Sequence, residues 1–146
     1  MEKSLHQQLS EVASREDNKD FFIQQVPQFM AQNLKATLGK RPYQQEAFGR
    51  TIYYLNSYYK NNNEPLQLLF HMATGSGKTV VMAGLILYLY QRGYRHFLFF
   101  VNSTTIIEKT KDNFLNKASS KYLFTENVHI GGKEIKIIEG TNFEGG

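Results

Sequence analysis

The stretch that decides the fold is Met72-Ala73-Thr74-Gly75-Ser76-Gly77-Lys78-Thr79. It follows a compact apolar run, 66–72, and precedes a longer one, 78–91. Glycines let the backbone turn tightly and present its N–H groups to phosphate oxygens, and a following helix directs the positive end of its dipole at the same oxygens. The sequence therefore predicts a phosphate-binding loop between a strand and a helix.

The loop residues have distinct expected roles. Lys78 should reach the β- and γ-phosphates of a nucleoside triphosphate, and Thr79 should hold Mg²⁺ through its hydroxyl. ATP and Mg²⁺ are thus the predicted cofactors. The general pattern begins with a glycine where this chain has Met72, although the core Gly-x-Gly-Lys-Thr is intact. The predicted nucleotide contacts of the loop are Thr74, Gly75, Ser76, Gly77, Lys78 and Thr79.

The segments around the loop indicate an α/β fold. The apolar runs 66–72 and 97–101 are typical of buried parallel strands. Residues 78–91 are apolar nearly all round, which predicts a buried helix, and Ser103 is expected to cap a helix over 104–116. This strand–helix–strand–helix order is that of an open parallel sheet.

Helices are expected before the loop and a hairpin after it. We predict a weak helix over 5–13, one helix over 21–38 entered at Pro27, and another over 43–60 followed by a loop at 61–65. After the second strand come a short strand candidate, a hairpin around two glycines, and a polar tail. Their residues are 122–124, then 128–130 with 134–138, then 141–146.

Composition narrows the class of protein. The 146 residues suffice for one domain, and the 17 Lys and Arg against 13 Asp and Glu give a net charge of +4, which permits but does not require binding to nucleic acid. The absence of cysteine excludes disulfides, thiolate catalysis and Cys-ligated zinc. The polar segment Met1–Asp20 is unlike a signal peptide, and the apolar run Val80–Tyr90 is too short to span a bilayer. A cytoplasmic protein without a membrane partner is expected.

Three segments together resemble superfamily 2 helicase-type ATPases. Residues 72–79 resemble motif I, in which the first glycine is often replaced. Arg41-Pro42-Tyr43-Gln44 resembles the element that precedes motif I in restriction-type translocases, and 99–106 occupies the place of motif Ia. With 121–124 and the hairpin after it, the chain is similar from Phe21 onward to the start of the restriction subunit of type III restriction–modification enzymes.

The resemblance implies a fold, an activity and further site residues. The fold is an incomplete P-loop NTPase (RecA-like) open sheet over 41–146, preceded by a leader and helical extension over 1–40. Gln44 would contact the adenine, unless it is simply a solvated residue at a helix start. Three residues would donate hydrogen bonds to the DNA backbone, unless they form an ordinary capped loop. They are Asn102, Ser103 and Thr104.

One part of an ATPase site is missing from the sequence. An ATPase of this class needs an Asp-Glu pair at the end of a later strand, but Asp occurs only at positions 17, 20 and 112. The Glu-x-Lys form at Glu134–Lys136 lacks the companion Asp of a nuclease. We therefore expect a fragment, cut before the acidic motif, that binds ATP weakly and does not hydrolyse it at a useful rate.

The predicted function is the ATP-binding part of a DNA-dependent ATPase and translocase. In the full type III complex, movement on double-stranded DNA would license site-specific cleavage after a partner methyltransferase (modification) subunit recognises the site. One alternative is the motor subunit of a type I restriction enzyme or a DNA-repair helicase. Others are a small P-loop kinase, against which the Arg-Pro-Tyr-Gln element argues, and a module that binds nucleotide without catalysis.

Overall fold

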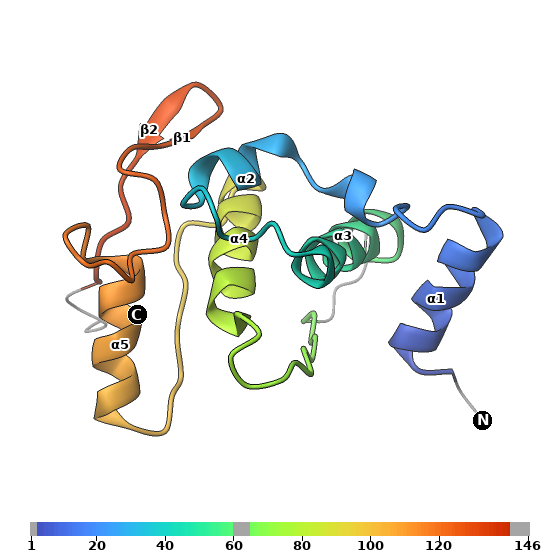
Figure 1. Cartoon of the computed structure of the whole chain (residues 1–146), viewed down its shortest axis with the longest axis horizontal. Helices are drawn as coiled ribbons and strands as arrows, with labels where there is room; N and C mark the ends of the chain where they lie inside the picture. Colours follow the sequence, from blue (N-terminus) through green and yellow to red (C-terminus); the bar gives the residue numbers. More distant parts are fainter. Residues whose placement is uncertain (1–2, 60–64, 141–146) are drawn as a thin grey trace. The chain divides into compact units, whose positions relative to one another are not determined.

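The computed structural model describes residues 3–59 and 65–140 of the chain. They form two compact units, of which the first comprises Met1–Gln28 with Gly39–Met82 and the second Phe29–Leu38 with Ala83–Gly146. Helix α4, Lys78–Gln91, begins in the first unit and continues in the second. Figure 1 shows the order of the helices and of one small hairpin along the chain.

The first unit contains α1 (Leu5–Arg15), the short 3₁₀ helix η1 (Ile23–Gln25) and α3 (Pro42–Ser57). Ser4 caps α1 in a capping box with Gln7, which stabilises a helix with little apolar content. Pro42 begins α3 at a position where its missing N–H costs nothing. The predicted helices at 5–13 and 43–60 are thus confirmed within a few residues.

A close approach between η1 and α3 organises the core of this unit. A Cβ atom on Gly49 would lie 1.8 Å from the carbonyl oxygen of Phe22, so only glycine fits there. The Phe22 ring is buried and meets Tyr53 edge-on at 5.6 Å between centroids. The Arg50 guanidinium lies over the Phe22 ring, 4.7 Å from its centroid. Residues 21–22 are therefore fixed against α3.

The single helix predicted over 21–38 is wrong. The structure has η1 followed by a separate α2 (Gln28–Asn33), and Val26 between them is extended with ψ 116°. A residue before proline avoids the helical region, and Val26 precedes Pro27. Directly after α2, Leu34 leaves the helix and pairs with Phe124 in an antiparallel bridge. Proline and a long-range pairing thus divide the helix.

The second unit is built around α5 (Thr104–Phe114) and the hairpin of β1 (Val128–Ile130) with β2 (Lys133–Ile135). The strands pair antiparallel, with His129 opposite Glu134, and Gly131 and Gly132 turn the chain with positive φ. The predicted hairpin is confirmed, although β2 is shorter than expected. The strand candidate 122–124 forms only the isolated bridge at Phe124. The predicted tail, 141–146, lies outside the described residues.

The two predicted parallel strands are not formed in the described part of the chain. Residues 65–73 and 94–101 run as irregular backbone without strand pairing, drawn as plain coil before and after α4 in the chain (Figure 1). Leu69 is 94% exposed and Phe100 90% exposed, so the expected burial is also wrong. A buried parallel strand must be hydrogen-bonded along its edges, and no described segment lies in register to do this. Within residues 3–59 and 65–140, the sheet observed is the two-stranded hairpin.

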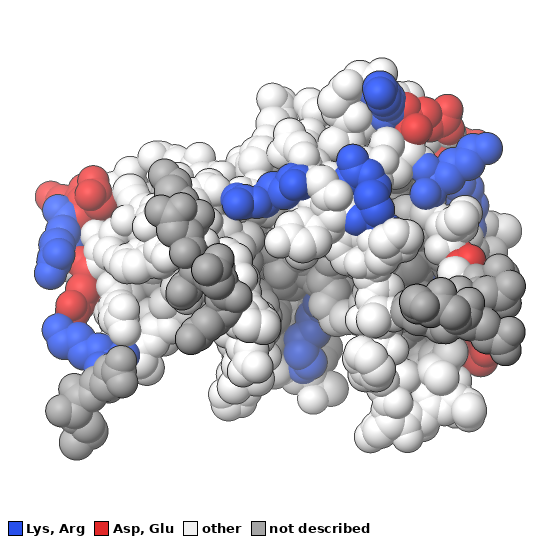
Figure 2. All heavy atoms as spheres, turned by 180° about the vertical axis from the view of Figure 1, so that it is seen from behind, with Lys and Arg blue, Asp and Glu red and all other residues white. Residues whose placement is uncertain are grey.

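The helices flanking these segments agree with prediction. Helix α4 has the predicted bounds, and α5 begins at its predicted cap, where the Ser103 hydroxyl accepts from the Ile106 N–H at 3.4 Å. Lys and Arg lie in separate groups on the face that Figure 2 presents, some of them beside acidic residues. None of the helices described is both long and apolar enough to cross a membrane.

Candidate nucleotide-binding site

The phosphate loop adopts a turn that glycine makes possible. Gly75 has φ 78° and Gly77 φ 88°, values that residues with a Cβ rarely adopt. Between them, the Ser76 N–H donates to the Ala73 carbonyl at 3.2 Å and the Ser76 hydroxyl to the same oxygen at 2.6 Å. Helix α4 begins directly after the loop, at Lys78. The loop therefore curls over the start of a helix, the arrangement that suits an anion.

The Lys78 side chain folds back over the loop. Its Nζ donates to the carbonyl oxygens of Met72 at 2.8 Å and Ala73 at 3.1 Å. Lys78 is exposed, so its ammonium keeps contact with water while it bridges the two ends of the turn. An anion in the loop would compete with these carbonyls for the same ammonium. Met72, which replaces the usual glycine, thus contributes through its main chain.

The start of α3 holds the loop from the other side. Gln44 is only 4% exposed, and its Nε2 donates to the Ser76 carbonyl at 3.0 Å. A Cβ on Gly77 would lie 2.3 Å from that Nε2, which shows how closely the amide packs. The alternative of a solvated Gln44 is therefore wrong. Its contact with an adenine remains a prediction.

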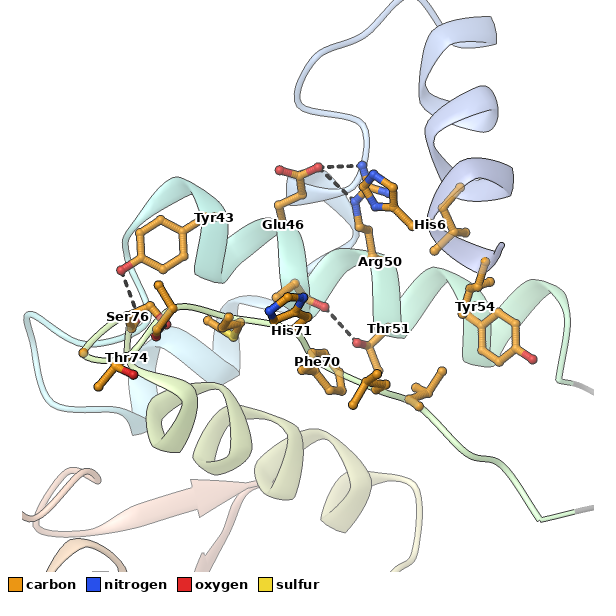
Figure 3. A pocket seen from close by; sticks show the side chains of 18 residues that line it. His6, Tyr43, Glu46, Arg50, Thr51, Tyr54, Phe70, His71, Thr74 and Ser76 are labelled. Carbon is orange, nitrogen blue, oxygen red and sulfur yellow. Dashed lines mark hydrogen bonds and ion pairs between the residues drawn. The ribbon is translucent and has the colours of Figure 1, made fainter. Parts of the chain in front are cut away.

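Tyr43 and Arg41 join this contact, and the sequence interpretation did not include them. The Tyr43 hydroxyl donates to the Ser76 carbonyl at 2.9 Å, drawn as a dashed line in Figure 3. Arg41 Nη1 donates to the Tyr43 oxygen at 2.9 Å. That hydrogen bond, followed by the attraction between the two groups, raises the pKa of Arg41 above its usual value. The sequence feature that could have identified Arg41 and Tyr43 is their position next to Gln44 in the Arg-Pro-Tyr-Gln element.

A cavity of about 840 Å³ adjoins the loop within the first unit. Arg50 on its wall donates through Nε and Nη2 to Glu46 at 2.9 and 2.7 Å, while its buried Nη1 has no hydrogen-bond partner among the described atoms. Figure 3 shows the two side chains of this pair projecting from α3, joined by dashed lines. The lining comes from α1, from one face of α3 and from the extended segment before the loop. It comprises Leu5, His6, Leu9, Tyr43, Glu46, Ala47, Arg50, Thr51, Tyr54 and residues 68–76.

The residues of the loop fit a nucleotide better than they fit a metal ion alone. Two glycines with positive φ, a lysine at the mouth and a helix start are together the donor set for a phosphate chain. Thr79, in the first turn of α4, offers one hydroxyl to Mg²⁺. Among the described residues no group of three His, Cys, Asp or Glu could hold a metal by itself. A magnesium ion here would take its other ligands from phosphate oxygens and water.

Sequence relatives decide the family. The family model described as type III restriction enzyme, res subunit matches residues 37–143, most of the chain. The chain belongs to this family. The probable type III restriction-modification enzyme HindVIP Res subunit of Haemophilus influenzae is similar, with 41% identity over 126 residues. This alignment covers 83% of the chain and 24% of the relative, so the chain spans about a quarter of that protein's length. No solved structure gives a significant match.

The predicted site residues of this Res-family chain fall into two groups. Gln44 and the loop residues 74–79 lie together in the first unit, where Gln44 Nε2 donates to the Ser76 carbonyl, and their contact with a nucleotide remains a prediction. Asn102, Ser103 and Thr104 are exposed at the start of α5 in the second unit. The Ser103 hydroxyl caps α5, as expected for the alternative in which these residues form an ordinary capped loop. Their contact with DNA remains a prediction.

Proposed function

We propose that this Res-family chain carries the ATP-binding part of a DNA-dependent motor. The main support for this proposal is the phosphate loop, in which Gly75 and Gly77 have positive φ and Lys78 lies at the mouth. Bound ATP would supply the energy for movement through hydrolysis of its terminal phosphate. The loop amides and Lys78 would bind the phosphates, Thr79 the magnesium ion, and Gln44 the adenine.

The fold that accompanies this function is the P-loop open sheet of helicase-type ATPases. Residues 66–72 alternate between half-buried and exposed positions, the period of an extended strand with one covered face. In this proposal 66–72 and 97–101 become parallel strands when neighbouring strands lie beside them. Residues 41–146 would form the first part of a motor domain and 1–40 its leader and helical extension. A cytoplasmic location belongs to the same proposal.

The activity of the whole protein is proposed from its relative. The Haemophilus influenzae protein is a probable type III restriction-modification enzyme subunit, which implies double-stranded DNA and a modification subunit as partners. The family match favours this function over a type I motor, a repair helicase or a P-loop kinase. DNA cleavage would then require parts that this quarter of the relative does not include.

Nucleotide binding by this chain tests the proposal. Equilibrium dialysis with labelled ATP and Mg²⁺ should show binding that weakens more than tenfold in Lys78→Ala, because a charge-assisted contact to phosphate is lost. Lys19→Ala removes an exposed lysine of the same unit and serves as the matched control. Equal binding by Lys78→Ala and wild type would refute the proposed site.

Hydrolysis separates the motor from the binding module. The sequence holds no Asp-Glu pair, so we expect no turnover above the Lys78→Ala background in this chain. This outcome leaves the binding module as a description of the isolated chain. Brisk turnover stimulated by DNA would contradict the expectation and place the catalytic acid within these residues.

The DNA contact needs its own test. Asn102→Ala should weaken binding of duplex DNA uniformly across sequences, because a hydrogen bond to the backbone carries no sequence information. Asn116→Ala, an exposed asparagine after the end of α5, is the control. Unchanged affinity and salt dependence in Asn102→Ala would exclude this contact.

A further inference from the structure

The carbonyl of Ser76 is where α3 and the phosphate loop are joined. Two donors reach its oxygen, the Tyr43 hydroxyl at 2.9 Å and Gln44 Nε2 at 3.0 Å. A carbonyl oxygen has two lone pairs, so these bonds use its full capacity. Because Arg41 Nη1 donates to the Tyr43 oxygen at 2.9 Å, the phenol accepts from one side and donates to the other. Three side chains of one short segment thus fix one oxygen.

The peptide plane carries this constraint to the amide of Gly77. The Ser76 C=O and the Gly77 N–H belong to one trans peptide, in which oxygen and hydrogen point in opposite directions. An oxygen held on α3 therefore directs the Gly77 N–H away from α3. Hydrogen bonds to a carbonyl also polarise its peptide and strengthen the N–H as a donor. The φ of 88° at Gly77 completes the orientation.

We propose that Tyr43, supported by Arg41, is a positioning residue that aims the Gly77 N–H at a phosphate oxygen of the nucleotide. The inference rests on the proposed function, since it deepens the role of the same loop. Tyr43 is 43% exposed, so its hydroxyl is not needed to complete a buried core. In this proposal the Tyr43 hydroxyl orients the Ser76–Gly77 peptide, and the Tyr43 ring has no role in phosphate binding.

Binding measurements on this chain test the hydroxyl apart from the ring. Tyr43→Phe keeps the ring and should weaken the binding of Mg·ADP and of Mg·pyrophosphate about fivefold, the value of one hydrogen bond. Pyrophosphate has no base, so a loss with both ligands assigns the effect to phosphate. Tyr58→Phe, with a similar exposure of 48%, is the control. Wild-type affinity of Tyr43→Phe for both ligands would overturn the proposal, as would a loss confined to ADP.

A double-mutant cycle tests the support from Arg41. If Arg41 acts through Tyr43, then Arg41→Ala should weaken binding less than Tyr43→Phe, and the double variant should match Tyr43→Phe alone. Additive losses would show that Arg41 contacts the ligand by itself. The unfolding temperatures of these variants should stay within about 2 °C of wild type, because the residues are exposed. A larger drop parallel to the loss of binding would instead indicate a merely structural role.

The nucleotide-free chain offers a readout that does not depend on the proposed function. The amide resonance of Gly77 should shift in Tyr43→Phe, and in the same direction but less in Arg41→Ala, while Tyr58→Phe leaves it in place. An unmoved Gly77 resonance would refute the coupling. If wild type binds neither ADP nor pyrophosphate, the proposed function fails, and the Gly77 resonance alone then decides whether Tyr43 orients this peptide.

Discussion

Gly75 and Gly77 have similar backbone conformations but different surroundings. Both have positive φ, 78° and 88°. A Cβ on Gly75 would meet nothing within 4 Å, whereas one on Gly77 would lie 2.3 Å from Gln44 Nε2. The first glycine is needed for its conformation alone. The second also makes room for the Gln44 side chain, which holds the loop. Substitutions at the two positions can therefore distinguish the cost of backbone strain from the cost of a steric clash.

The two glycines should therefore respond differently to alanine. Gly75→Ala should cost about 1–2 kcal/mol of stability, the price of a left-handed residue with a Cβ. Gly77→Ala should cost more and should weaken ATP binding further, because the new methyl displaces Gln44. Chemical denaturation and labelled-ATP binding of both variants provide the check. Similar effects at both positions would show that the Gln44 side chain moves aside at little cost.

The loop could be predicted from sequence because its chemistry is local. Glycines, lysine and threonine at fixed spacing identify Gly75 to Thr79 without knowledge of the rest of the chain. The contact of Tyr43 with Ser76 joins residues 33 positions apart, so the Arg-Pro-Tyr-Gln element marks Tyr43 without identifying its partner. The exposure of Leu69 could not be predicted either. An apolar run indicates a strand, but its burial depends on neighbours that the run does not specify.

At the scale of elements, Asn33 ties α2 to the hairpin. Its Nδ2 donates at 2.8 Å to both the Phe29 and the His129 carbonyls, and its Oδ1 accepts from the His129 N–H at 2.7 Å. The amide thus pairs with the main chain of β1 as a neighbouring strand would. Asn33 is 4% exposed, so water does not replace these bonds readily. The sequence interpretation placed this residue inside one long helix and missed the role.

Asn33→Ala should loosen the hairpin more than the rest of the chain. The loss of three hydrogen bonds should cost about 3 kcal/mol. Amide hydrogen exchange should then speed up most over β1 and β2. Asn33→Asp keeps the acceptor but sets a carboxylate against two carbonyl oxygens, so it should be no better than alanine. Asn116→Ala, at an exposed position, should cost under about 1 kcal/mol. Unchanged exchange over the hairpin in Asn33→Ala would contradict this role.

At the scale of the whole molecule, the two segments predicted as strands carry the most exposed leucine and phenylalanine side chains of the described residues. Leu69 is 94% exposed on the first segment, and Leu98 and Phe100 are 58% and 90% exposed on the second. A segment with unpaired backbone N–H and C=O groups and exposed apolar side chains is a surface to which another strand can add. The proposed parallel sheet would cover both segments. This makes the accessibility of the segments a test of the proposed fold.

Single cysteines can measure that accessibility, because the sequence has none of its own. In this chain, Leu69→Cys and Phe100→Cys should react with a thiol reagent at nearly the rate of a free peptide. Leu87→Cys, at a position 2% exposed, should react far more slowly. When the remaining sequence of the Haemophilus influenzae relative is appended, the first two should become protected. Undiminished reactivity in a folded, ATP-binding chimera would rule out the parallel sheet.

The Asn33 contact also sets an order of events during synthesis. Asn33 and His129 are 96 positions apart. At about 5–20 residues per second, a ribosome needs roughly 5–20 s to make the chain between them. For that time Asn33 has no hairpin main chain to pair with, and Leu34, buried in the finished fold, has no Phe124 with which to form its bridge. The second unit therefore closes late, and its first ten residues are the part of the nascent chain in which a chaperone would find the longest opportunity to bind.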